Sequence, residues 1–198
     1  NNSTNEAKFV KLLLKKLSTN LEILTWIGKK PNKNCLCAGK RATCEGCPNL
    51  GQSFKRVQGQ VKIQENISLK NYNTFGIDVK ARFFVEITGL VQLQKVLELK
   101  AYPKKFIISG GSNMLLTKDI DALVMHIQLK GISLVHEDED TVEIKVMAGE
   151  NWHELVMWSL EQGYGGLENL SLIPGNVGTT PIQNIGAYGV ELKDVFVN

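Results

Sequence analysis

A stretch of 22 residues without one charged side chain, from Asn169 to Val190, constrains this chain more than any other feature. It reads NLSLIPGNVGTTPIQNIGAYGV and contains four glycines and two prolines. Gly and Pro interrupt it too often for a membrane helix, and it lacks the regular period of a core element. Glycine lets backbone N–H groups approach a ligand closely, and missing carboxylates remove repulsion of an anion. We interpret the segment as a wall around an anionic group such as a phosphate; a buried, turn-rich core segment is the alternative.

The charge distribution divides the chain into two parts. Residues 1–60 carry 11 Lys or Arg against 3 Asp or Glu, and residues 61–198 carry 12 against 17. We therefore expect a small basic extension over residues 1–60 and a separate domain over residues 61–198. No apolar run approaches the roughly 18 residues of a membrane span, and the polar, Lys-rich first residues contain no apolar core of a signal peptide. A cytoplasmic protein without a membrane partner is predicted.

Four cysteines in the basic extension have the spacing C-x-C-x6-C-x2-C. Two close pairs can each supply half of a tetrahedral Zn²⁺ site, and neighbouring Lys and Arg side chains favour ionised thiolates. Zinc is the preferred interpretation, with an iron–sulfur cluster or no metal as alternatives. The basic residues would also attract nucleic acid, but too few aromatic side chains accompany them for nucleic-acid binding to be expected. The predicted metal ligands are Cys35, Cys37, Cys44 and Cys47.

A β-α-β unit is predicted in the second part of the chain. A strand at residues 83–87 is followed by an apolar stripe at helical spacing over residues 90–97, and then by a short strand at 106–108. Thr88 is the expected cap of the helix. The crossover between two such strands is normally right-handed.

The second of these strands runs directly into Ser-Gly-Gly-Ser-Asn at residues 109–113. A Gly-Gly turn at the carboxyl end of a strand is a place where α/β sheets bind ligands. The pattern G-x-G-x-x-G is not satisfied and no helix clearly follows, so this is not a Rossmann fingerprint. The residues fit a backbone nest for a phosphate, although a simple tight turn explains them equally well.

Further strands are predicted over residues 123–127 and 141–148. Asn151 then begins a helix as part of a capping box, and Gly163 is placed to end it. His153 on this helix is assigned no catalytic role. The inner face of the helix is expected to comprise Trp152, Leu155, Val156 and Leu160.

Four segments resemble the UDP-N-acetylenolpyruvoylglucosamine reductases, flavoproteins of peptidoglycan precursor synthesis. The resemblance covers residues 61–198 and includes nothing in residues 1–60. It implies an α+β, FAD-binding domain of the p-cresol methylhydroxylase type, built from two α/β subdomains with FAD between them. The segments, in chain order, are NYNTFGI at 71–77, SGGSNMLL at 109–116, AGENWHELV at 148–156 and GLENLSLIPGNVGTTPIQNIGAYGVEL at 166–192.

The resemblance also assigns residues to two sites. The turn at 110–113 and the two residues after it would hold the pyrophosphate and ribityl chain of FAD, and the charge-free segment would form the second wall. Apolar Ile173, Val177 and Ile185 are available to cover the flavin ring, and Tyr188 would face the UDP side of the substrate. The expected FAD-binding residues are Gly110, Gly111, Ser112, Asn113, Met114, Leu115, Ile173, Pro174, Gly175, Gly178, Thr179, Thr180, Gly186 and Ala187.

The implied reaction uses NADPH to reduce FAD, which then passes a hydride to the enolpyruvyl double bond of a UDP-sugar to give UDP-N-acetylmuramate. The family's catalytic Arg, Ser and Glu would lie beyond Asn198, so no catalytic residue is named, and for the isolated chain we expect weakened or lost flavin binding and no turnover. The carboxylates at residues 137–140 are interpreted as a solvated turn. The alternatives are another flavin oxidoreductase of the same fold, or a non-enzymatic zinc-binding module in residues 1–60.

Overall fold

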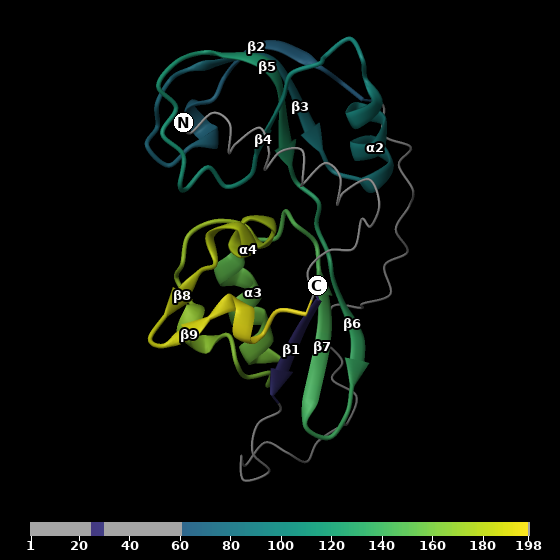
Figure 1. The fold of residues 1–198 in the computed structure, drawn as a ribbon, viewed down its shortest axis with the longest axis vertical. Helices are drawn as coiled ribbons and strands as arrows, with labels where there is room; N and C mark the ends of the chain where they lie inside the picture. The colour runs from purple at the N-terminus through teal and green to yellow at the C-terminus, as the bar shows by residue number, and fades with distance from the viewer. Residues whose placement is uncertain (1–24, 30–60, 198) are drawn as a thin grey trace, which may run out of the picture.

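The structure, a computed structural model, describes residues 61–197 and the backbone of residues 25–29. The predicted metal ligands Cys35, Cys37, Cys44 and Cys47 lie outside the described residues. Two lobes make up the described part, and the chain passes between them where the first sheet leads into the second (Figure 1). None of the helices in these residues is long and apolar enough to cross a membrane.

The first lobe is a four-stranded mixed sheet in the order β2-β3-β5-β4. The strands β3, β5 and β4 run parallel, and β2 pairs antiparallel with β3. Helix α2 (Leu90–Glu98) joins β3 to β4, which confirms the predicted β-α-β unit, with β5 lying between its two strands. The strands are β2 (Gln64–Ser68), β3 (Lys80–Ile87), β4 (Lys105–Ile108) and β5 (Ile120–Ile127).

Both faces of this sheet are covered by apolar side chains. Val85 and Ile87 pack with Leu93 and Val96 of α2 on one face. Phe84, the residue before Val85 on β3, packs in a second cluster on the other face. Alternate residues of a strand point to opposite faces, so burial on both sides explains why these strands read as short apolar runs rather than alternating patterns.

The predicted cap of α2 is wrong by one residue. Gly89, not Thr88, is the N-cap, and it offers no side-chain hydrogen bond. The Thr88 N–H instead donates to Oε1 of Gln92 at 2.9 Å, and its hydroxyl lies 3.3 Å from the same oxygen. The Gln92 side chain therefore reaches back over the helix start and binds the residue that precedes the N-cap.

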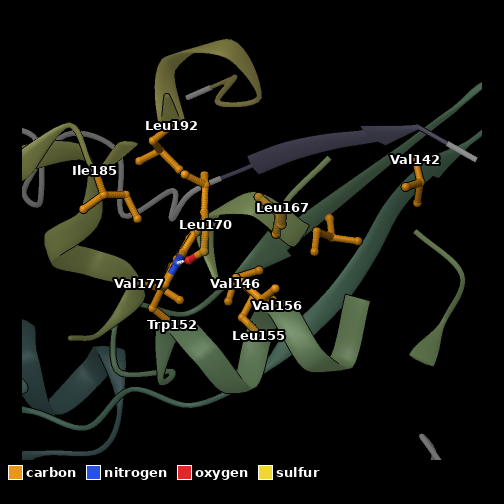
Figure 2. Close-up of a cluster of buried hydrophobic side chains, with 11 residues drawn as sticks. Val142, Val146, Trp152, Leu155, Val156, Leu167, Leu170, Val177, Ile185 and Leu192 are labelled. Atoms are coloured by element: carbon orange, nitrogen blue, oxygen red, sulfur yellow. Dashed lines mark hydrogen bonds between the residues drawn. The ribbon is translucent and has the colours of Figure 1, made fainter. Parts of the chain in front are cut away.

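The second lobe is built on a three-stranded antiparallel sheet in the order β1-β7-β6. Helix α3 (Trp152–Glu161) lies against one face of it, where Val142, Ile144 and Val146 are buried (Figure 2). The sequence did not predict β6, whose residues are largely exposed and give no alternating signal. The strands are β1 (Thr25–Lys29), β6 (Ile132–Glu137) and β7 (Thr141–Val146).

The ends of α3 agree with the sequence, but its inner face differs at one position. Oδ1 of Asn151 accepts the Glu154 N–H at 3.1 Å, and Gly163 follows the helix with a φ of +77°. Leu160, expected on the inner face, is 43% exposed, and Ser159 is fully buried instead. The small Ser159 side chain lets its hydroxyl donate to the Val156 carbonyl at 2.8 Å, so its burial leaves no unpaired polar atom.

The acidic run between β6 and β7 forms the predicted solvated turn. The Asp138 carboxylate accepts the N–H groups of Thr141 and Asp140 at 2.7 and 2.9 Å and the Thr141 hydroxyl at 2.9 Å. These bonds favour the charged carboxylate, with the Thr141 N–H as the largest cause, and lower the pKa of Asp138 from 3.8 to about 2. The charged carboxylate therefore stabilises the turn.

Candidate functional site

The turn at residues 109–113 lies at the carboxyl edge of the parallel strands, directly after β4. Gly111 has a φ of +61°, and a Cβ there would collide with the Tyr72 carbonyl oxygen and come within 2.9 Å of the Asn73 Cα. Only glycine fits this position. Within residues 61–197, the N–H groups of residues 110–113 donate to no protein acceptor, so they remain free to bind a ligand. Successive N–H groups of this kind at a glycine turn suit an anion-binding nest, here residues 110–113.

The loop beneath this turn is held by the side chain of Asn73, which is 7% exposed. Its Nδ2 donates to the carbonyls of Leu69 and Ile77 at 2.7 and 3.0 Å, and its Oδ1 accepts the Ile77 N–H at 3.0 Å. The Thr74 N–H donates to the Gly111 carbonyl at 3.3 Å and ties the loop to the turn. The 71–77 motif therefore packs against the turn at residues 109–113 and holds it in place.

The structure brings the two predicted walls into contact although they lie far apart in the sequence. The Ser112 hydroxyl donates to the Pro174 carbonyl at 3.3 Å. A Cβ at Gly110 would lie 3.3 Å from the Gly175 Cα, and a Cβ at Gly175 would lie 3.2 Å from the Ser112 Oγ. Glycine at both positions therefore permits the approach of the two backbones.

Residues 148–152 join the charge-free segment to the rest of the molecule. The N–H groups of Gly178 and Val177 donate to the Ala148 and Glu150 carbonyls, each at 2.9 Å. A Cβ at Gly178 would lie 2.6 Å from the Cβ of Ala148, so the two segments pack as closely as backbone allows. Sequence reasoning assigned this motif only the start of a helix. Gly149 in the same motif marks a different close approach, because a Cβ there would lie 2.6 Å from the Leu129 backbone.

Several side chains of the charge-free segment serve the protein core. Val177 and Ile185 are 1% and 7% exposed and pack against α3 and β7, so the expectation that they cover a flavin ring is not met. Ile173 is half-buried against the same cluster. The hydroxyls of Thr179 and Thr180 donate to carbonyls three residues earlier, at 2.7 and 2.8 Å. The alternative of a turn-rich core segment is therefore correct for these side chains, while the backbone of Pro174 and Gly175 lies at the junction with residues 110–112.

The end of the segment forms a short helix and a hairpin. Helix α4 (Thr180–Gln183) lies on the side of the second lobe that faces the first (Figure 1). The strands β8 (Gly186–Ala187) and β9 (Val190–Glu191) are joined by Tyr188 and Gly189, with φ values of +52° and +80°. Two positive φ values fit a type I′ turn, and Tyr188 is 90% exposed at its tip.

The remaining predicted residues extend the nest and the hairpin. Asn113 and Leu115 are exposed after the Gly-Gly turn, and Met114 packs partly into the core of the first lobe. Gly186 lies against Glu191 within the hairpin, and Ala187 packs partly against the second core. The contacts of these last two residues are thus within the second lobe.

Sequence reasoning missed a buried histidine near the nest. His126 on β5 is 9% exposed and packs edge-on against Tyr72, with ring centroids 4.9 Å apart. Its Nε2 lies 2.8 Å from Nε2 of Gln128, and its Nδ1 lies 3.8 Å from Oε1 of Glu86. Burial lowers the pKa of His126, and the Glu86 carboxylate partly opposes that effect. A lone His in an apolar strand gave no signal that would separate it from an ordinary core residue.

The sequence matches a known protein family and several named relatives. Residues 81–198 match a family described as "FAD binding domain". UDP-N-acetylenolpyruvoylglucosamine reductases from Flavobacterium johnsoniae and Pseudomonas putida are 59% and 53% identical over 138 and 139 residues. These alignments cover 70% and 69% of this chain and 41% of each relative, so the chain spans about two fifths of their length.

A solved structure shares the fold. UDP-N-acetylenolpyruvylglucosamine reductase from Thermus caldophilus superposes with a TM-score of 0.54 at 24% identity, covering 68% of this chain and 47% of that one. At this identity the likeness concerns the fold, which agrees with the predicted α+β class. The family match extends over more than half of the residues of this chain, and the chain therefore belongs to the FAD-binding domain family.

Proposed function

We propose that this chain is the FAD-binding part of a UDP-N-acetylenolpyruvoylglucosamine reductase that uses NADPH as its reductant. The identity to reductases of that name supports the assignment. The single observation that carries it is the contact between the two glycine walls, in which Ser112 donates to Pro174 at the carboxyl edge of the parallel strands. Ligands of α/β sheets bind at such edges.

The residues present at this junction suit the diphosphate of FAD. Four N–H groups at residues 110–113 are without a protein acceptor in the described part of the chain, and the facing segment carries no carboxylate. Neutral donors can bind a dianion without burying a salt bridge, whose desolvation is costly. Side chains at Gly110, Gly111 or Gly175 would press on neighbouring protein atoms and so distort the junction that the ligand would occupy.

A division of labour follows for the proposed FAD site. Residues 110–113 would bind the diphosphate, and the backbone of the charge-free segment would orient the ligand from the opposite side. FAD, when bound, supplies the redox chemistry. The proposed FAD-binding residues are Gly110, Gly111, Ser112, Asn113, Met114, Leu115, Ile173, Pro174, Gly175, Gly178, Thr179, Thr180, Gly186 and Ala187.

The proposed small-molecule partners are NADPH and a UDP-sugar, with no membrane or nucleic-acid partner. Tyr188 is available to the UDP-sugar because its ring stands exposed at the tip of a hairpin. A bulky residue at positive φ is strained, and such strain gathers at functional positions. A reductase of nucleotide-linked sugars would work in the cytoplasm.

A chimera tests the proposal. Joining the chain at Asn198 to the C-terminal part of the Flavobacterium johnsoniae relative should give a yellow protein that releases FAD on denaturation. It should also oxidise NADPH only when the enolpyruvyl substrate is present. A folded chimera that takes up no FAD contradicts the proposal. A chimera that binds FAD but reduces only other substrates identifies a different flavin oxidoreductase.

A second candidate function concerns the extension. We propose that Cys35, Cys37, Cys44 and Cys47 bind Zn²⁺, on the ground of their paired spacing. Metal analysis of the purified chain should find about one zinc per molecule. The double variant Cys35→Ser, Cys37→Ser should lose it, and unchanged zinc content in that variant would dismiss the site.

A further inference from the structure

The first turn of α3 holds the charge-free segment at three points. Nε1 of Trp152 donates to the Leu170 carbonyl at 2.7 Å, as Figure 2 shows, and the Trp152 N–H donates to the Gly175 carbonyl at 3.0 Å. Between these two points, the Leu172 N–H donates to Nδ1 of His153 at 3.2 Å. Two adjacent helical residues thus clamp residues 170–175.

The middle point of the clamp is a strained residue without packing. Leu172 has a φ of +62°, and its side chain is 76% exposed. The left-handed conformation is unfavourable for a residue with a Cβ, and so exposed a side chain gains little from burial. The hydrogen bond to His153 is the contact available to offset that cost.

The position of Leu172 bears directly on the nest. Two residues later, the Pro174 carbonyl accepts the Ser112 hydroxyl, and Gly175 lies against Gly110. If residue 172 left the left-handed conformation, the direction of the chain entering Pro174 would change. The separation of the two walls would then change with it.

We propose that His153 is a positioning residue for FAD, a role that rests on the FAD-binding function proposed above. Its Nδ1 carries no proton and accepts the Leu172 N–H. This hydrogen bond holds the left-handed turn that precedes Pro174. The Pro174 carbonyl then receives Ser112, and the N–H groups of residues 110–113 stay at the spacing that the FAD diphosphate requires. His153 acts through the loop and not by contact with FAD.

Three substitutions at His153 separate this role from general effects on the helix. His153→Asn keeps an acceptor, because the amide oxygen is attached to Cγ just as Nδ1 is. His153→Gln moves the acceptor one bond further from the backbone, and His153→Ala removes it. Met157→Ala, one turn later on α3 and exposed, is the matched control for changes in the helix itself.

The first measurement is a titration of the full chain with FAD, followed by flavin fluorescence. His153→Ala and His153→Gln should weaken binding about tenfold, equivalent to about 1.4 kcal/mol and in the range of one hydrogen bond. His153→Asn and Met157→Ala should stay within about twofold of the parent chain. Parent-like affinity in His153→Ala, or equal weakening by Asn and Ala, overturns the role. If His153→Ala does not fold, the Asn and Gln variants decide between the same outcomes.

The second measurement needs no FAD and keeps the two proposals distinguishable. Hydrogen exchange at the Leu172 amide should be slow in the parent chain and in His153→Asn, and clearly faster in His153→Ala. Equal exchange rates in all three proteins overturn the role of His153. If the Leu172 amide is protected but the folded chimera takes up no FAD, the proposed function is contradicted and the clamp itself stays intact.

Discussion

The backbone of Gly111 rests directly on the carbonyl oxygen of Tyr72, so closely that even a methyl group at residue 111 would overlap it. This contact joins the loop at residues 69–77 to the turn after β4. It also fixes the orientation of the unpaired N–H groups that we propose as the FAD diphosphate site. The contact and the positive φ of Gly111 together explain why this position requires glycine.

Gly111→Ala should destabilise the protein by about 3 kcal/mol and abolish FAD binding, because the new Cβ meets both strain and backbone. Gly76→Ala is the matched control: its φ of +63° is nearly the same, but a Cβ there meets nothing within 4 Å. It should cost only about 1–2 kcal/mol, the conformational strain alone. Urea unfolding of both variants provides the measurement, and equal losses would refute the role of the Tyr72 contact.

Asn73→Ala should destabilise the first lobe by about 2–4 kcal/mol, because three buried backbone groups of Leu69 and Ile77 lose their partners. Asn71→Ala, two residues earlier and exposed, should change stability by less than about 0.5 kcal/mol. Chemical unfolding of both variants compares them. A loss at Asn73 no larger than that at Asn71 would show that the loop does not depend on this side chain.

The turn at Asp138 should contribute stability that depends on pH. Its folded pKa of about 2 lies below the ordinary value of 3.8, so the contribution is complete above about pH 4 and is lost as the pH falls towards 2. Asp138→Ala should therefore melt below the parent chain at pH 6, and the difference should disappear near pH 2. Glu139→Ala, which removes none of these bonds, should show no such trend; a pH-independent difference for Asp138→Ala would speak against the assignment.

The elements with a clear apolar pattern could be predicted from the sequence. Helix α3 and strand β7 follow from local periodicity and capping, and β3, β4 and β5 follow from short apolar runs. Strand β6 could not be found, because its exposed residues carry no alternation. Likewise, Val177 and Ile185 looked available for a ligand, since an apolar side chain in a glycine-rich loop does not reveal which side of the loop it faces.

For the site, the sequence identified the two glycine-rich segments but not their contact. Ser112 and Pro174 meet only because residues 148–152 hold the second segment against the sheet edge, and that is a long-range arrangement. The contact of His153 with Leu172 could not be predicted either. A histidine on a helix gives no local sign of which backbone N–H will donate a hydrogen bond to it. The resemblance to a family led to the prediction of FAD as cofactor, and the structure showed which residues contact one another.

Binding of FAD to the chimera with the Flavobacterium johnsoniae C-terminal part tests the central claim most directly. Adding the chimera to a fixed concentration of FAD should quench the flavin fluorescence with saturation, and FAD should raise the melting temperature of the chimera. A ligand at 100 times its dissociation constant stabilises a protein by about 2.7 kcal/mol. Riboflavin, which lacks the diphosphate, should have a much weaker effect. A cooperatively folded chimera whose melting temperature and flavin signal stay unchanged up to millimolar FAD would contradict the account.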